Sequence, residues 1–285
     1  MSIRKRSLPR GWYPVDQKEC QREIEAFIEG WSPSLSLKTV RGGIVPHAGW
    51  YFSGKLAARV FYLLKSKGKP DLIVLYGGHL GPNDLPRMVM EQRWETPFGE
   101  VEMERAFAEN LAKRIELKPE SPASGDNTIE IQLAMVKYFF PDSKLLAIRS
   151  PSSMKAERLG DEVAGLAKEK GLAILAIGST DLTHYGPNYG LVSKGIGPSA
   201  LRWVKEENDK GFIDCALRMD AKGLIKHANE NESACSAGAA ASAIATCRAL
   251  GAEKGHLIDY YTSYDVMPDE SFVGYAGIVY SLQNI

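Results

Sequence analysis

Residues 172–186 read LAILAIGSTDLTHYG, and the expected fold follows from their pattern. The first six residues are apolar, which is typical of a short strand buried on both faces of a parallel sheet. Glycine and small polar residues follow at once, and a helical pattern at 155–170 precedes the strand. Strands that alternate with helices are typical of α/β proteins. The stretch therefore predicts an α/β fold in which a buried strand ends in a polar loop.

The same alternation continues along the chain in both directions. Strands are expected at 39–45, 72–76, 88–91, 144–148, 256–262 and 275–282. Apolar residues have helical spacing at 55–64, 104–114 and 129–140, and residues 199–250 are mainly helical and rich in alanine. The sequence contains no linker, repeat or low-complexity tract. We therefore predict a single three-layer α/β domain over residues 1–285, with a central, mostly parallel sheet covered by helices.

Composition excludes several classes of protein. The 35 basic residues balance 35 acidic ones, so the chain lacks the broad positive field that binds nucleic acid or anionic membranes nonspecifically. No apolar run in the sequence reaches the roughly 18 residues of a transmembrane helix. The 4 cysteines show no CxxC spacing, which indicates reduced thiols. We expect a cytoplasmic enzyme, or a binding protein on an enzyme-like fold, that binds neither nucleic acid nor membranes.

Three of the 5 histidines share one sequence context. His47, His79 and His184 each come shortly after a predicted strand. In parallel α/β sheets, the loops at the carboxyl ends of the strands converge on one crevice, where ligands bind. Imidazole is the commonest protein ligand for transition metals. A loop histidine bound to neighbouring backbone is the alternative for each one alone, but three of them predict a common site. His227 and His256 lack this context.

Cys235 and Asp181 are further candidates for the site. Cys235 is expected at the start of an alanine-rich helix, where the helix dipole would favour a metal-binding or nucleophilic thiolate. An inert buried thiol is the alternative. Asp181 precedes His184 by three residues and is expected to orient its imidazole as an acid–base partner, or else to cap a turn. Glu130 is expected in the first turn of a helix, where compensation of the dipole is the usual role.

Five motifs occur in order along nearly the whole chain. They are GWYP at 11–14 with IEAFI at 24–28, VPHAGWYFSG at 45–54, WETPFGEV at 94–101, STDLTHYG at 179–186, and the segment around Cys235. In this order they resemble the Memo family, the Memo-like proteins that also occur as a component of the AmmeMemoRadiSam group. Candidate aromatic wall residues of a pocket are Trp50, Tyr51, Trp94 and Tyr185, although ordinary packing is the better-supported role for them.

The resemblance implies a fold similar to the LigB-like class III extradiol dioxygenases, which use non-haem Fe(II). It implies that His47, His79 and Cys235 are the metal ligands and that Asp181 and His184 line the same pocket as catalytic residues. Those dioxygenases use two histidines and a carboxylate, whereas a thiolate also suits copper or zinc. The chain departs from the family at Asn127, where a histidine is usual, and at the residues before His79, which read YGG in place of GPS.

The leading interpretation is a mononuclear metal-dependent oxidoreductase with Fe(II) as the expected ion and copper or zinc as the alternatives. His184, oriented by Asp181, would move protons. A second interpretation is a non-catalytic module on a dioxygenase-like scaffold that binds a metal or a peptide, including a phosphopeptide. A third is a zinc hydrolase with Asp181 or Glu130 as the base. The substrate is expected to be a small molecule or a peptide, and the resemblance implies a functional link to a radical-SAM protein.

Overall fold

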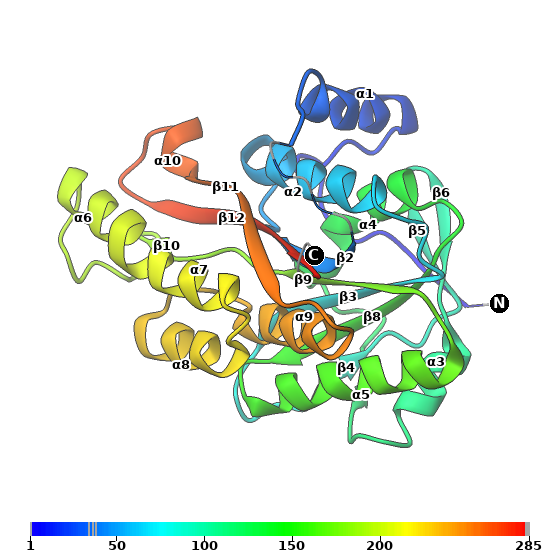
Figure 1. Cartoon of the computed structure of the whole chain (residues 1–285). Coiled ribbons are helices and arrows are strands. Elements are labelled where there is room, and N and C mark those ends of the chain that lie inside the picture. The colour runs from blue at the N-terminus through cyan, green and yellow to red at the C-terminus, as the bar shows by residue number, and fades with distance from the viewer. Residues whose placement is uncertain (1, 34, 36, 38, 283–285) are drawn as a thin grey trace.

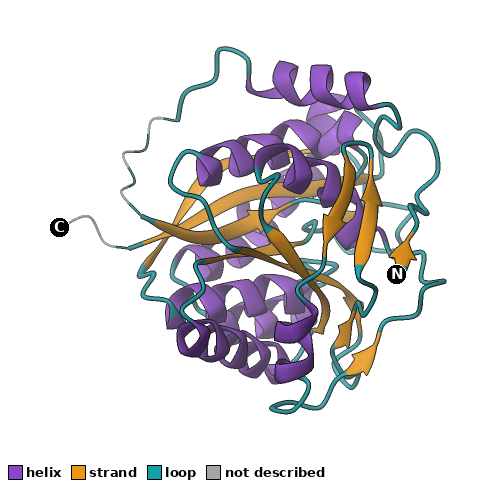
Figure 2. Ribbon diagram, turned by 90° about the vertical axis from the view of Figure 1, so that its right-hand side faces the viewer, coloured by secondary structure: helices purple, strands orange, loops and turns teal. Residues whose placement is uncertain are grey.

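A computed structural model describes residues 2–33, 35, 37 and 39–282. It contains a nine-stranded mixed sheet between two layers of helices (Figure 1). Figure 2 shows the same three layers from the side, with the strands between helices above and below. This arrangement confirms the predicted α/β class. Within the described residues, every helix is too short or too polar to cross a membrane.

The long parallel strands form the centre of the sheet, and a short parallel pair, β4 with β7, lies at one edge. The parallel strands, in spatial order, are β2 (Val40–Val45), β9 (Ile174–Ser179), β3 (Leu72–Leu80) and β8 (Lys144–Pro151). Beyond β2, the antiparallel strand β12 (Phe272–Ser281) pairs with β11 (Lys254–Thr262) and with β10 (His184–Tyr185). Beyond β8 lie the two-residue strands β4 (Arg87–Met88) and β7 (Lys118–Pro119). A separate three-stranded sheet consists of β1 (Ile3–Arg4), β5 (Arg93–Thr96) and β6 (Gly99–Glu102).

Helices cover both faces of the large sheet (Figure 1). One face carries α1 (Gln17–Ile28), α2 (Trp50–Lys65) and α4 (Asn127–Phe139). The other carries α3 (Arg105–Leu111), α5 (Met154–Lys170), α7 (Asp209–Leu217), α8 (Ala221–Asn231) and α9 (Ala237–Ala249). The remaining helical segments are α6 (Pro198–Trp203), the π-helical turn Val204–Asn208 and α10 (Ser263–Val266). The two faces therefore enclose two separate apolar cores.

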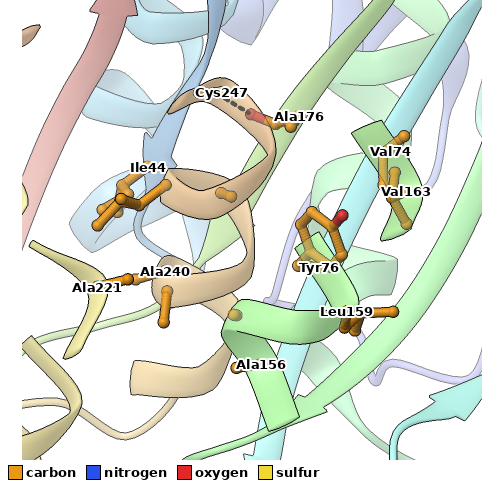
Figure 3. Close-up of a cluster of buried hydrophobic side chains, with 14 of the residues drawn as sticks. Ile44, Val74, Tyr76, Ala156, Leu159, Val163, Ala176, Ala221, Ala240 and Cys247 are labelled. Carbon is orange, nitrogen blue, oxygen red and sulfur yellow. Dashed lines mark hydrogen bonds between the residues drawn. The ribbon is translucent and has the colours of Figure 1, made fainter. Parts of the chain in front are cut away.

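The alternation of side chains along β3 shows how the strands serve both cores. Leu72, Val74 and Tyr76 pack on the side of α5 and α9, whereas Ile73 and Leu75 pack on the side of α2 and α4. A strand that is buried on both faces reads as a continuous apolar run, which is why these runs were recognisable in the sequence. Figure 3 shows Tyr76 and Val74 beside apolar residues of α5.

Small residues let α9 pack closely against the sheet and against α5. A Cβ atom at Gly178 of β9 would lie only 2.7 Å from the carbonyl oxygen of Ala239 in α9. A Cβ atom at Gly160 of α5 would lie 2.5 Å from the carbonyl oxygen of Ser242. At the end of β3, a side chain on Gly78 would overlap Ser236, which caps α9. These contacts hold the start of α9 against the carboxyl ends of the central strands.

The four aromatic residues considered as pocket walls have other places in the fold. Trp50, Trp94 and Tyr185 are buried among apolar side chains. Tyr51 is exposed and stacks edge to face on Phe52. Packing is therefore the role of the three buried residues, because each lies in a core rather than at a cavity.

Candidate functional site

Three side chains meet at the carboxyl ends of the central strands. His47 follows β2, His79 lies near the end of β3, and Cys235 comes just before α9. One ligand atom from each of them lies within 4.8 Å of the others. We call His47, His79 and Cys235 the donor cluster. The structure therefore brings together the three residues that the sequence analysis singled out as metal ligands.

The His79 ring is held by a buried ionic network. Its Nδ1 lies 3.0 Å from the Asp126 carboxylate, which caps α4. Arg149 contacts the same carboxylate at 3.2 Å and also bonds Glu120 and the carbonyl oxygen of Gly78. Because a carboxylate only accepts, Nδ1 of His79 carries a proton and Nε2 is left free for a ligand. The His79 backbone itself has a φ of 60°, a conformation that is rare outside glycine.

His47 is buried and held mainly through its backbone. Its N–H donates to the Asp181 carboxylate at 2.6 Å, and its carbonyl oxygen accepts from Asn127 at 3.1 Å. Its ring Nε2 lies 3.1 Å from Sγ of Cys235, and Nδ1 lies 3.4 Å from Ser179. Asn127, at the position where a histidine is usual in the family that the motifs resemble, therefore orients the first donor through the main chain.

Close packing shifts the pKa values of the donor cluster toward the charged forms of its members. Burial alone would lower the pKa of His47, but Cys235 and Asp181 beside it raise that pKa to about 9. The hydrogen bond to Asp126 raises the pKa of His79 to about 10. Burial opposes ionisation of Cys235, yet the two imidazoles hold the pKa of its thiol well below the usual range. These shifts share one cause, since each group lies beside partners that favour its charged form.

The predicted position of Cys235 in a helix is corrected by the structure. The helix begins at Ala237 with Ser236 as its N-cap, so Cys235 precedes the first turn. Its backbone N–H donates to the carbonyl oxygen of Asp181 at 3.3 Å. The low pKa of Cys235 therefore comes from the neighbouring imidazoles, after they overcome burial, rather than from a place within the helix.

A cavity of about 460 Å³ opens beside the donor cluster. We call it the site pocket. It is lined by both cluster histidines, by polar residues and by aromatic walls: His47, His79, His184, Asn127, Asp181, Asn188, Asp269, Ser263, Ser271, Trp12, Phe52, Tyr189, Tyr275, Ala48, Gly49, Met267 and Val273. Its mixed lining and its contact with two potential ligands make it the candidate substrate site.

Asp181 and His184 both line the site pocket, but they do not form the expected pair. Nδ1 of His184 lies 3.0 Å from the carbonyl oxygen of Leu182, so that nitrogen carries a proton and Nε2 is free to accept one. Asp181 bonds the backbone of His47 instead, and burial raises the pKa of its carboxyl group. Asp181 therefore positions His47, and a backbone carbonyl orients His184.

A buried carboxylate, Asp209, supports the loop that carries His184. It accepts hydrogen bonds from the backbone and hydroxyl of Thr183, and from Tyr260 at 2.7 Å. All three donors are neutral, so burial prevails and raises the pKa of Asp209 from 3.8 to about 6. Asp209 was not recognised in the sequence, because its contacts join segments that are far apart along the chain.

The raised pKa of Asp209 predicts a pH-dependent stability. The folded state binds the proton more tightly than the unfolded state, so this contribution is fully present below pH 4 and is lost as pH rises through about 6. Two pKa units correspond to about 3 kcal/mol of unfolding free energy. Urea denaturation of the wild type and of Asp209→Asn between pH 4 and pH 7 measures this. The unfolding free energy of the wild type should fall more steeply with pH than that of Asp209→Asn. Parallel pH dependences would contradict a raised pKa of Asp209.

The N-terminal segment 5–13, which we call the N-terminal strap, reaches the site pocket through Trp12. Glu130 of α4 holds it: the carboxylate accepts from the backbone N–H groups of Ser7 and Leu8 at 2.9 Å and from the hydroxyl of Tyr13 at 3.2 Å. Glu130 is buried. Its role is therefore to anchor the strap rather than to compensate an exposed helix dipole.

Comparisons with known proteins identify relatives along nearly the whole chain and a solved structure of similar fold. A family model described as "Memo-like protein" matches residues 4–279. A MEMO1 family protein of Nitrosopumilus maritimus is 33% identical over an alignment that covers 97% of this chain and 98% of that protein. Another, of Methanococcoides burtonii, is 31% identical, with 94% and 96% covered. The crystal structure of an uncharacterized protein from Escherichia coli K12 is similar in fold, with a TM-score of 0.51 and 11% identity over 78% of this chain and 91% of that one.

Proposed function

Since the chain belongs to the family of Memo-like proteins, we propose that it is a metal-dependent oxidoreductase with one ion held by His47, His79 and Cys235. The observation that carries this proposal is the donor cluster, whose three ligand atoms lie within 4.8 Å of one another. Its position supports the proposal, because the site pocket gives a substrate access to two of the three residues.

The donor chemistry of the cluster fits such an ion. Metal–imidazole bonds of about 2.0–2.1 Å and metal–thiolate bonds of about 2.3 Å place the donors of one ion roughly 3–4 Å apart. Nε2 of His47 and Sγ of Cys235 are 3.1 Å apart, so the side chains would need only small shifts. Asp126 accepts the proton of Nδ1 and so fixes the tautomer of His79 that leaves Nε2 free, as carboxylates commonly do for histidine ligands. Two imidazoles and a thiolate suit Fe(II), which we expect, as well as copper or zinc.

The charge of the cluster favours exchange of protons for a metal ion. Binding of a divalent cation requires a thiolate and neutral imidazoles, so it would displace protons from both rings. The two imidazoles lower the pKa of the Cys235 thiol and so favour its thiolate, and the Asp126 carboxylate accepts the proton on Nδ1 of His79. We therefore expect metal affinity to fall as pH falls, since the imidazole protons compete with the ion.

When bound, the ion would supply redox and Lewis-acid chemistry at the inner end of the site pocket. The chain supplies the remaining functions. His184 has a free Nε2 on the pocket wall and is placed to accept a proton from a substrate hydroxyl. Trp12 and Phe52 would cover an apolar substrate and exclude water, because aromatic walls bury most of a small ligand.

A phosphopeptide-binding role has less support from the pocket. Among its described lining residues there is no lysine or arginine, which are the residues that usually bind phosphate. The guanidinium of Arg149 lies near His79 but is committed to Glu120, Asp126 and main-chain carbonyls. We therefore favour an enzyme over a phosphopeptide-binding module.

Elemental analysis of anaerobically purified protein tests the proposal. We expect about one ion per chain in the wild type, and near-complete loss in His79→Ala and Cys235→Ser, because each removes one of three ligands. Matched controls are His256→Gln and Cys215→Ser, which change a histidine and a cysteine outside the donor cluster. Both controls should retain the ion.

The identity of the ion then separates the remaining functions. Iron or copper, together with oxygen uptake on addition of a substrate, supports the oxidoreductase. Zinc alone would favour a hydrolase, for which ester and amide substrates would be screened. Wild type that stays metal-free after incubation with Fe(II), copper and zinc would overturn the proposal, as would full metal retention in both cluster variants.

A further inference from the structure

We propose that the site pocket selects substrates that carry a cationic amine, and that Asp269 is the residue that pairs with this amine. The inference deepens the proposed function and rests on it for the claim that the ligand is a substrate. Selection by charge is a property of the pocket itself, so it can be measured without any metal.

The first observation is the sign of the charged groups around the pocket. Its lining includes the carboxylates of Asp181 and Asp269, and none of its described lining residues is lysine or arginine. The donors of Arg149, the guanidinium beside His79, are taken up by Glu120, Asp126 and nearby carbonyl oxygens. The charge favoured on the lining rings of His47 and His79 is offset by their close partners Cys235 and Asp126. At Asp269, by contrast, an anionic group would lose hydration and face a like charge, whereas a cationic group would gain a partner.

The second observation is that hydrogen bonds and close packing fix the segment that carries Asp269 at the rim of the site pocket. Its Oδ1 accepts from the backbone N–H of Ser271 at 2.9 Å, and the Ser271 hydroxyl accepts from the backbone N–H of Asn188 at 3.1 Å. A Cβ atom at Gly186, whose φ is +110°, would lie 2.5 Å from the carbonyl oxygen of Glu270. The two rim segments are therefore locked together, and they present the carboxylate at a defined position.

The third observation is an aromatic residue, Tyr189, that lines the site pocket together with the two carboxylates. Burial raises the pKa of the Tyr189 phenol, and the carboxylates of Asp181 and Asp269 raise it further. Tyr189 also packs edge to face on His184, with ring centroids 5.0 Å apart. Tyrosine faces attract both apolar skeletons and cations. The geometry thus favours an amine on an aromatic or apolar skeleton, with its cationic end at Asp269 and its other end toward the donor cluster.

Three small phenols that differ in charge test the inference. Tyramine, 4-ethylphenol and 4-hydroxyphenylacetate all contain a 4-substituted phenol ring. At pH 7 the first is cationic, the second neutral and the third anionic. Calorimetric titration of metal-free protein at low ionic strength gives their affinities. We expect tyramine to bind about threefold to tenfold more tightly than 4-hydroxyphenylacetate, with 4-ethylphenol between them. The difference should shrink as salt is added, because the amine and the carboxylate are partly exposed to solvent.

Asp269→Asn keeps the shape of the side chain and removes its charge, so we expect it to abolish the preference for tyramine. Glu270→Gln is the matched control, since Glu270 is the neighbouring acidic residue and is not part of the pocket lining. That variant should keep the preference. Equal affinities in the wild type, no binding of tyramine at millimolar concentration, or an unchanged preference in Asp269→Asn would each overturn the inference.

Metal analysis of the same preparations keeps the two claims distinct. A wild type that binds a metal but shows no preference among the phenols would overturn the inference and leave the oxidoreductase proposal standing. A wild type that prefers tyramine but takes up no metal would overturn the proposed function, while the pocket would remain a site for cationic ligands.

Discussion

Gly42→Ala should remove most of the folding stability. Gly42 lies in β2 in register with Ala176 of the neighbouring strand β9, and its φ is +156°. A Cβ atom there would overlap the carbonyl oxygen of Ala176 and would lie 2.8 Å from Sγ of Cys247. The first obstacle is backbone at the centre of the sheet, and the second is a buried side chain of α9, so neither can move away without disturbing the core. We expect a loss of about 4 kcal/mol or more, against a typical total of roughly 5–15 kcal/mol for a domain.

Urea denaturation followed by circular dichroism measures this loss, and the yield of folded protein gives a second readout. Gly165→Ala is the control, because Gly165 lies within α5 and a Cβ atom there would meet open space. That variant should gain up to about 1 kcal/mol, since alanine is the better helix former. A Gly42→Ala protein as stable as the wild type would contradict the close pairing of β2 with β9.

Glu130→Ala should have the second largest effect. The carboxylate satisfies the N–H groups of Ser7 and Leu8 and the hydroxyl of Tyr13 in a buried setting. Each donor left without a partner costs about 1–3 kcal/mol, so we expect a total of about 4 kcal/mol unless the strap detaches. Detachment would also release the contact in which the Trp12 carbonyl accepts from the backbone N–H of Trp50 at 2.8 Å.

Two measurements distinguish an attached strap with unpaired donors from a strap that has detached. Urea denaturation gives the global loss, and hydrogen exchange at Ser7 and Leu8 reports detachment of the strap. Tyr13→Phe is the control, because it removes one donor and keeps the ring, and it should cost only about 1 kcal/mol. Unchanged stability together with unchanged exchange in Glu130→Ala would show that the carboxylate does not anchor the strap.

The parts of the site that follow strands were predictable from sequence. Apolar runs identify strands that are buried on both faces, and the glycine and polar residues after them mark the loops at their carboxyl ends. His47, His79 and His184 were found in this way, and the structure places all three on one pocket. Cys235 precedes a helix rather than following a strand. The family resemblance was therefore the stronger reason to group it with the three histidines.

The supporting residues were not predictable by the same means. Asp126 could be recognised as a helix cap, but its bond to His79 spans 47 residues and depends on how α4 meets β3. Arg149 is likewise 70 residues from His79, whose carbonyl oxygen it contacts. The orienting role of Asp181 was wrong for a related reason, since local spacing gave no information on the backbone of His47. Periodicity identifies elements, whereas such contacts depend on their tertiary arrangement.

The short strands at one end of the large sheet have a consequence for solubility. An unpaired sheet edge can template pairing with a second molecule, and proteins blunt such edges with short strands, proline, charge and bulges. Here the far edge is the two-residue strand β7, which contains Pro119, a residue without an N–H to donate. On the opposite side, the nine-residue strand β11 has a register shift between Leu257 and Asp259. Both edges are therefore poor templates for β-aggregation, which should keep the protein dispersed at the concentrations that metal and ligand titrations require.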